Sequence, residues 1–209
     1  MRWTKAIFVI LVLTWGGNTL AQDDHPCGPL RNHYGPFDYN NPVHRRDKLP
    51  IVEKFHFNSK VENLIDGING PVWTDLNYTL RTFPNHHRAL YAMAMWQLKH
   101  PRGPNHPPRY LTIDCYFDRA LRFTPRDGNI WMIYGIFLHR KGLLEEAMEK
   151  YKKAEELLSQ NATLHYNLGL LLLDMEKTDE ARTHAKKAYA LGYPLPGLRD
   201  KLKQRNAWE

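Results

Sequence analysis

Apolar side chains recur at helical spacing along the second half of the chain, with small residues at fixed places among them. Between Gly128 and Pro194 this pattern occurs twice, with an offset of 34 residues. The matched pairs are Gly135 with Gly169, Leu138 with Leu172, Ala147 with Ala181, and Ala154 with Ala188. Four coincidences in one register indicate an internal repeat, and the helical period predicts two helices in each copy.

The small residues of this repeat are typical of two antiparallel helices that pack closely together. Gly135 would let the second helix of a pair approach the backbone of the first, and Ala147 and Ala154 would do the same from the facing side. A single pair of helices cannot bury its apolar face alone, so neighbouring pairs must stack, and about three are needed for stability. We therefore expect more repeats than these two.

The repeated unit resembles the tetratricopeptide repeat, a helix-turn-helix of about 34 residues. The positions that carry the resemblance in the first copy are Trp131, Tyr134, Gly135, Leu138, Ala147, Tyr151 and Ala154. In the second copy they are His165, Leu168, Gly169, Leu172, Ala181, Ala185 and Ala188. The resemblance implies an all-α fold, a right-handed solenoid of helical hairpins. The chain as a whole is also similar to the small exported bacterial proteins of this superfamily.

Upstream of the clear repeats, apolar spacing and prolines define two further helices. Ser59 is expected to cap a short helix over residues 60–65, with Glu62 completing a capping box. A second helix over residues 72–83, ended by Pro84, would complete a degenerate first repeat.

The next repeat is predicted to carry an insertion. Its two helices would cover residues 85–98 and 110–123, and the prolines between Pro101 and Pro108 can only form a loop. After the last repeat, further prolines break the chain at residues 194–196. A short basic helix from Leu198 to Arg205 would then cap the stack, as repeat arrays require.

Residues 22–58 show no helical period and are rich in turn formers and aromatic residues. Proline and glycine at this density forbid a long helix. The aromatic residues, however, are too numerous for a disordered tail: Tyr34, Phe37, Tyr39, Phe55 and Phe57. We therefore expect an extended arm that packs onto the repeats. The alternative is that residues 34–39 form a binding loop.

The first residues differ in composition from everything that follows. Arg2 and Lys5 precede an apolar run from Ala6 to Trp15, and small and polar residues follow as far as Ala21. This order is typical of a secretory signal peptide, and the run is too short to span a bilayer. We expect cleavage after Ala21, export to the periplasm or beyond, and no membrane-spanning segment in the mature chain. An uncleaved N-terminal anchor is the alternative.

The composition of the 209 residues, with 43% hydrophobic and 24% charged side chains, suits one ordinary globular domain. The formal net charge is +7, but acidic and basic residues alternate, as between Glu145 and Glu156. Such mixing is typical of a solvated helix surface and not of a nucleic-acid-binding stripe. We expect no nucleic-acid partner, and the oligomeric state stays open.

Cys27 and Cys115 are the two cysteines of the chain. In an exported protein, thiols are normally paired. Counted along the repeats, Cys115 occupies the position held by Glu149 and Thr183, which implies an outward-facing place on a second helix. We expect a disulfide that ties the arm to the outer side of the stack and leaves the inner groove open. Two unpaired thiols, or an intermolecular pair, are the alternatives.

The resemblance also implies a binding groove, because the first helices of such repeats line a concave face that takes peptides or protein segments. The corresponding positions here are Met132, Ile136, His139, Tyr166, Asn167, Leu170 and Leu173. Met132 and Ile136 stand where a carboxylate clamp would need polar groups, so an apolar or aromatic partner segment fits better. Alternatively, the arm or the capping helix covers part of this groove.

The groove predicts a non-catalytic protein-protein interaction module or assembly adaptor of the bacterial envelope. Its partner would be another envelope or exported protein, and no cofactor is expected. We expect no enzymatic activity, because the chain has neither a Gly-x-Ser-x-Gly motif nor a phosphate-binding glycine loop.

The alternative function is a periplasmic copper- or zinc-binding protein, because the chain has 11 histidines. The candidate ligands form a histidine and methionine cluster: His86, His87, Met93 and Met95. Against this, His86 and His87 are adjacent and would diverge by about 100° on a helix. The chain also lacks Cys-x-x-Cys and His-Glu-x-x-His motifs.

The expected organisation follows the chain in seven parts. They are a signal peptide (1–21), an extended arm (22–58), a degenerate first repeat (59–84), a repeat with an inserted proline-rich loop (85–127), two tetratricopeptide-like repeats (128–161 and 162–195) and a capping helix (196–209).

Overall fold

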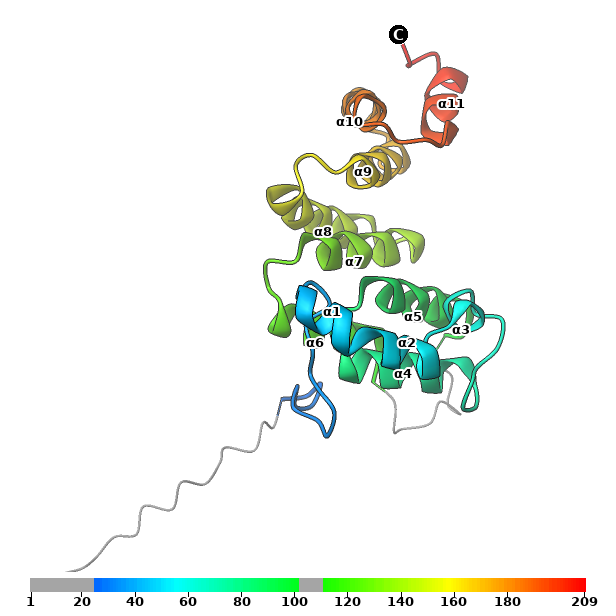
Figure 1. The fold of residues 1–209 in the computed structure, drawn as a ribbon. Helices are drawn as coiled ribbons and strands as arrows, with labels where there is room; N and C mark the ends of the chain where they lie inside the picture. The colour runs from blue at the N-terminus through cyan, green and yellow to red at the C-terminus, as the bar shows by residue number, and fades with distance from the viewer. Residues whose placement is uncertain (1–24, 102–110) are drawn as a thin grey trace, which may run out of the picture.

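The computed structural model describes residues 25–101 and 111–209. The expected signal peptide and most of the expected proline-rich loop lie outside these residues. Within them the chain forms helices and no strands, which confirms the predicted all-α fold (Figure 1). None of the helices in the described ranges is both long and apolar enough to cross a bilayer.

The helices follow one another with short connections. In chain order they are α1 (Pro42–Asp47), α2 (Leu49–His56), α3 (Ser59–Glu62), α4 (Val72–Thr82), α5 (His87–Lys99), α6 (Ile113–Phe123), α7 (Gly128–Arg140), α8 (Leu144–Leu157), α9 (Ala162–Asp174), α10 (Thr178–Ala190) and α11 (Gly197–Gln204). The most extensive packing joins α7 to α8 and α9 to α10. Figure 1 shows these two hairpins stacked above α5 and α6, with α11 beside α9 and α10.

Small residues let the paired helices approach one another, as the repeat pattern predicts. A Cβ atom added to Gly135 of α7 would lie 2.7 Å from the ring of Tyr151 in α8. Ala147 and Ala154 of α8 are fully buried on either side of that ring. In the next hairpin, Gly169 of α9 makes the same kind of close approach, here to the Leu198 side chain of α11.

The expectation that residues 22–58 are extended is wrong between Pro42 and His56, where the chain forms α1 and α2. The prolines lie at the first positions of these helices, where the missing N–H has no intrahelical partner to lose. The Asn41 side chain caps α1 by accepting hydrogen bonds from the next backbone N–H groups. Prolines that the sequence analysis interpreted as breakers therefore begin two short helices.

The helix expected over residues 60–65 is shorter and has another cap. Asn58, and not Ser59, accepts hydrogen bonds from the first N–H groups of α3. The Glu62 carboxylate does not complete a capping box, because it pairs with the Arg88 guanidinium of α5. Leu64 then adopts a left-handed backbone conformation, with φ of 57°, which ends the helical path before Ile65.

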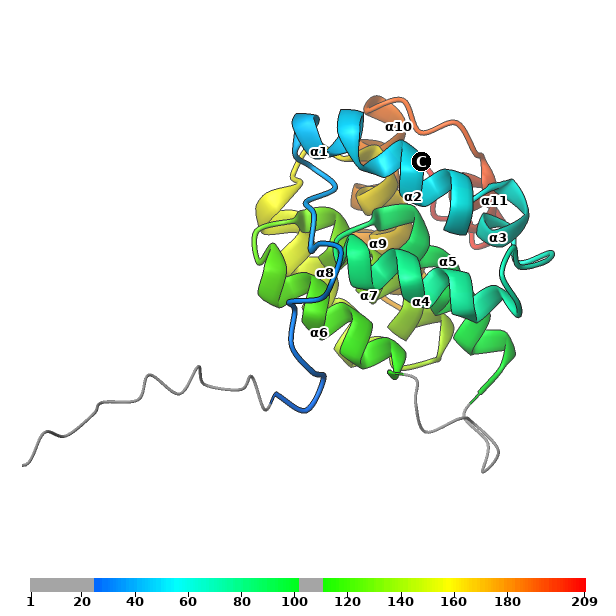
Figure 2. The same cartoon turned by 60° about the horizontal axis from the view of Figure 1, so that its bottom comes forward.

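Residues 25–41 pack onto the repeats, and Figure 2 shows them passing beside α6 before α1 begins. The backbone N–H of Tyr39 donates to Asn85 Oδ1 at 2.9 Å, and Asn85 Nδ2 donates to Asp38 Oδ1 at 2.7 Å. Asn40 Nδ2 donates to Asp127 Oδ2 at 2.6 Å. These bonds attach the arm to the turns that precede α5 and α7.

Candidate functional site

The predicted Cys27–Cys115 disulfide is confirmed, with the two Cα atoms 5.0 Å apart. It joins the arm to α6, and hydrogen bonds to carbonyl groups of the arm reinforce the junction. Arg122 Nη2 donates to Gly28 O at 2.8 Å, and Arg122 Nε donates to Asp118 Oδ2 at 2.9 Å. The arm therefore starts from a covalent anchor on a second helix of the stack.

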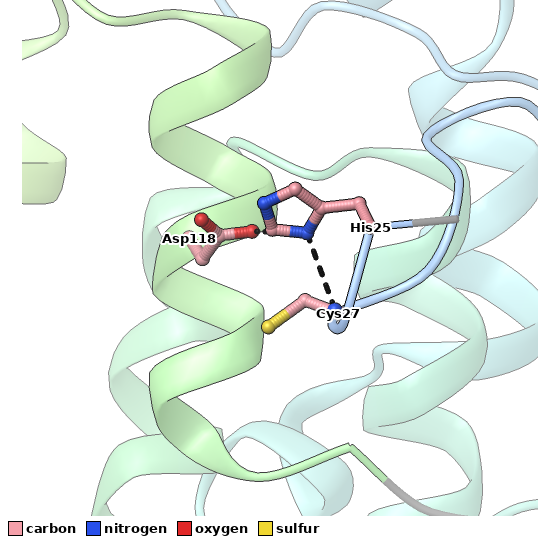
Figure 3. Close-up of side chains that lie close together, drawn as sticks. All are labelled: His25, Cys27 and Asp118. Atoms are coloured by element: carbon pink, nitrogen blue, oxygen red, sulfur yellow. Dashed lines mark hydrogen bonds and ion pairs between the residues drawn. The ribbon is translucent and has the colours of Figure 1, made fainter. Parts of the chain in front are cut away.

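Figure 3 shows His25, Cys27 and Asp118 close together at this anchor. His25 Nδ1 accepts a hydrogen bond of 3.2 Å from the Cys27 backbone N–H and lies 3.5 Å from Asp118 Oδ2. Because Cys27 Sγ is bonded to Cys115, it offers no thiolate to a metal ion. This group of side chains is thus a structural junction between the arm and α6.

The groove predicted from the resemblance is only partly accessible. Met132, Ile136 and Leu173 are buried, with exposed fractions of 8%, 9% and 1%, so they belong to the core and the prediction is wrong for them. The reason for the two α7 residues is that α7 lies mid-stack, where it packs against α5, α8 and α9. Leu173 is covered by the end of α11, where Arg205 Nη1 donates a hydrogen bond of 3.0 Å to the Leu173 carbonyl.

The other predicted groove residues remain at least partly exposed. His139 Nε2 lies 2.8 Å from Asp174 Oδ2, which links the ends of α7 and α9. Asn167 uses its side chain within α9, donating to the Thr163 carbonyl at 2.8 Å. Tyr166 and Leu170 lie partly buried against the core cluster.

Tyr166 belongs to a cluster of tyrosines that the sequence analysis did not assemble. We call Tyr91, Tyr166, Tyr189 and Tyr193 the tyrosine cluster. The rings of Tyr166 and Tyr193 stack with their centroids 4.0 Å apart. Burial raises the pKa of the Tyr193 hydroxyl, and the neighbouring hydroxyls of Tyr166, Tyr189 and Tyr91 raise it further. Tyr91 of α5 therefore lies near the turn that follows α10, about a hundred residues later in the chain.

The tyrosine cluster is held in place but retains free surface. The Tyr189 hydroxyl accepts a hydrogen bond of 3.0 Å from the Arg199 N–H and donates one of 3.1 Å to the Leu195 carbonyl. Tyr91 is 38% exposed and Leu195 is 57% exposed. The result is an apolar and aromatic surface with tyrosine hydroxyl groups, positioned by α5, α9, α10 and the turn before α11.

The predicted histidine and methionine cluster does not converge on a metal position. His86 is fully buried, with its ring nitrogens engaged by the Ala89 N–H and by Glu53. His87 Nε2 lies 2.7 Å from Asp127 Oδ2. Met93 is buried in the core, and the Met95 sulfur accepts a hydrogen bond from Arg140. The candidate ligand side chains are therefore engaged in helix capping, ion pairing, hydrogen bonding or core packing.

A cavity of about 340 Å³ lies between the arm and α4. Its wall includes Tyr34 of the arm, His56 of α2, and Asp75 and Tyr78 of α4. Asp75 is fully buried and accepts hydrogen bonds from the N–H groups of Ile68 and Asn69 and from the Asn69 side chain. Burial alone would raise the pKa of Asp75, but these bonds and the one to His56 outweigh it and lower the pKa. Asp75 therefore stabilises the loop before α4.

A family model described as TPR repeat matches residues 137–176, from the end of α7 to the end of the α9 segment. This segment is therefore a tetratricopeptide repeat, as the sequence pattern predicts. The matched part covers α8 and α9, the two helices that join the clear hairpins. Among curated proteins, none matches the sequence.

The tetratricopeptide repeat assignment places the tyrosine cluster within the array. Tyr166 lies on α9, the first helix of the last hairpin, and Tyr91 lies on α5, which packs against the first helix of the hairpin before it. First helices of two units, with the α7–α8 hairpin between them, thus contribute Tyr91 and Tyr166 to this surface. The sequence signal for Tyr91 was its place on a predicted first helix. Tyr193, beside a proline after the last helix, carried no such signal.

Proposed function

We propose that the protein holds an extended apolar or aromatic segment of another exported protein against the tyrosine cluster. Tetratricopeptide repeats are protein-protein interaction elements, and the repeat assignment supports that general role for this chain. The observation that carries the finer proposal is the stacking of Tyr166 on Tyr193, with Tyr189 bonded to the exposed Leu195 and the exposed Tyr91 of α5 close enough to influence the pKa of Tyr193. Tyrosine is enriched at protein interfaces because one side chain supplies apolar area and a hydrogen-bonding group.

Export supports the choice of an envelope or secreted partner. The order of charged, apolar and small residues before Gln22 favours a cleaved signal peptide, and a disulfide is typical of an oxidising compartment. We place the protein in the periplasm of a bacterium or outside the cell. The mass of the mature chain tests this step, because cleavage after Ala21 leaves Gln22 as the first residue.

The proposed role of the tyrosine cluster is tested by affinity capture from the envelope extract of the source cell. The mature chain is compared with a Tyr91→Glu, Leu195→Glu variant, which places two charges on exposed apolar positions of the proposed surface. Ile65→Glu is the matched control, because Ile65 is 72% exposed on the loop after α3. We expect a partner that the wild type and the control capture and the double variant loses, with the same circular dichroism spectrum for all three.

Equal capture by the double variant would overturn the assignment of this surface. Once a partner is identified, a peptide that spans its apolar segment should bind with the same preference. Each charged substitution at a central interface position should weaken binding by about tenfold or more.

A further inference from the structure

Three side chains with metal-binding atoms, none of them part of the tyrosine cluster, meet between the last two hairpins. They are Glu155 of α8, His165 of α9 and His184 of α10, and their ligand atoms all lie within 4.8 Å of one another. His165 Nδ1 is 3.0 Å from His184 Nδ1 and 3.8 Å from Glu155 Oε1. Three helices that are separate in sequence thus direct one nitrogen or oxygen each to a common point.

The protonation of His165 follows from its hydrogen bonds. Its side chain is fully buried, and Nε2 lies 2.9 Å from the Ser159 carbonyl oxygen. A carbonyl only accepts, so Nε2 carries the proton and donates it. In the neutral ring, Nδ1 then has a free lone pair, which faces His184 and Glu155. A backbone carbonyl that orients an imidazole in this way is the usual outer partner of a metal-binding histidine.

His184 supplies the second nitrogen. Its Nδ1 lies 3.0 Å from His165 Nδ1, and because that His165 atom has only a lone pair, the proton between the two rings is on His184 Nδ1. When a metal ion binds, this proton would move to His184 Nε2, so that His184 Nδ1 would present a second lone pair. Glu155, half-buried beside them, adds one negative charge to balance a cation.

We propose that Glu155, His165 and His184 bind one divalent transition-metal ion of the zinc class. Two imidazole nitrogens and one carboxylate oxygen form a common zinc ligand set, which leaves a fourth position for water. In a tetrahedral site with Zn–N bonds of 2.0–2.1 Å, ligand atoms lie about 3.3 Å apart. The observed separations of 3.0 and 3.8 Å lie on either side of that value, and the third pair, His184 and Glu155, lies within 4.8 Å, so side-chain movement of up to about 1.5 Å completes the site.

The ion would act as a clamp on the C-terminal part of the array. It would join α8 of one hairpin to α9 and α10 of the next, and so stabilise the junction between two repeats. The site differs in residues and role from the histidine and methionine cluster near α5, whose side chains have other partners. It also shares no residue with the tyrosine cluster, so loss of the metal and loss of partner capture are tested with separate variants.

The test uses the mature chain, washed with EDTA and dialysed against zinc chloride, with bound zinc measured by elemental mass spectrometry. We expect one zinc ion per chain and a higher midpoint of thermal unfolding when zinc is present. His184→Ala should abolish both effects, and Glu155→Gln should weaken binding by at least about tenfold, as even outer-shell changes do. His100→Ala is the matched control, because this exposed histidine lies at the end of α5.

The site would be overturned if the wild type failed to retain zinc. It would also be overturned if His184→Ala and Glu155→Gln retained as much zinc as the wild type. Nitrogen-15 spectra of the histidine rings provide a measurement that does not depend on the variants. Coordination should shift the Nδ1 resonances of His165 and His184 while the Nε2–H of His165 persists. Unchanged resonances on addition of zinc would show that the two rings are joined only by a hydrogen bond.

Discussion

At the scale of single residues, His86 shows how a buried imidazole sets the response of the fold to pH. Its Nδ1 accepts a hydrogen bond of 3.2 Å from the Ala89 N–H and so caps α5, which requires that Nδ1 carry no proton. Its Nε2 lies 3.2 Å from Glu53 Oε1 and donates to it. Burial lowers the pKa of His86 below 6.5, despite the opposing effect of Glu53. In the unfolded chain the ring takes up a proton near its ordinary pKa.

The unfolded state therefore binds more protons than the folded state just below pH 6.5, and stability should fall as the pH falls. We expect the free energy of unfolding to decrease between about pH 7 and pH 5, by at most about 1.4 kcal/mol per pH unit for this group. Asparagine caps helices without titrating, so His86→Asn should flatten the decrease. Urea unfolding at a series of pH values measures this. An unchanged slope in His86→Asn, with His100→Asn as control, would contradict the assignment.

At the scale of helices, the sequence predicted those helices whose packing requires small residues at regular spacing. The α7 to α10 hairpins were predicted because Gly135, Ala147 and their equivalents must be small for the helices to touch. α1 and α2 were missed because the same prolines that forbid helix interiors are tolerated at helix starts. Local composition does not show whether a proline breaks a helix or begins one. Here the burial of Leu49 and Val52 against the arm decides that the chain forms helices.

The same close packing predicts what a single methyl group does between α7 and α8. In Gly135→Ala the new Cβ would meet the Tyr151 ring at 2.7–3.0 Å, inside van der Waals contact. Overpacking costs about 1–3 kcal/mol, which exceeds the gain of at most about 1 kcal/mol in helix propensity. We expect a net loss of stability in chemical denaturation. Tyr151→Leu should reduce that loss in the double variant, whereas Tyr151→Phe, which keeps the ring, should not.

A double-variant cycle that shows no coupling between positions 135 and 151 would contradict this account.

Tyr151→Phe also has an expected effect of its own. Among residues 25–101 and 111–209, the buried Tyr151 hydroxyl has no hydrogen-bond partner, and burial raises its pKa. Its removal should therefore leave stability unchanged or increase it by up to about 1 kcal/mol.

At the scale of the whole molecule, the candidate surface depends on curvature, which the sequence does not encode in any local pattern. Tyr166 could be selected in advance because it lies on a first helix of a clear repeat. Tyr91, although it lies on a predicted first helix, and Tyr193 could not be grouped with it, because only the stacking of the helices brings α5 toward the turn after α10. For the same reason Met132 and Ile136 were assigned to a groove although the mid-stack position of α7 buries them.

The disulfide was predictable because two cysteines in a chain expected to be exported have one intramolecular pairing. Its loss should affect the stability of the whole molecule. Cys27 and Cys115 are 88 residues apart, so the bond removes much of the freedom of the unfolded chain. In the chain-entropy model its loss costs about 4 kcal/mol. We expect Cys27→Ser, Cys115→Ser to lower the free energy of unfolding by about that amount, and a reducing agent to do the same to the wild type.

Hydrogen exchange distinguishes this global effect from detachment of the arm alone. Tyr39 and Asn40 bond to Asn85 and Asp127, the turns that start α5 and α7, so release of the arm should loosen those helices as well. Amide protection should therefore fall together in the arm, α5 and α7. If protection fell only before α1 while α5 kept its wild-type rates, the arm would be an appendage and not part of the cooperative unit. An Asn40→Ala variant that keeps both cysteines isolates the contribution of the Asn40–Asp127 bond, since it leaves the Tyr39–Asn85 bond in place.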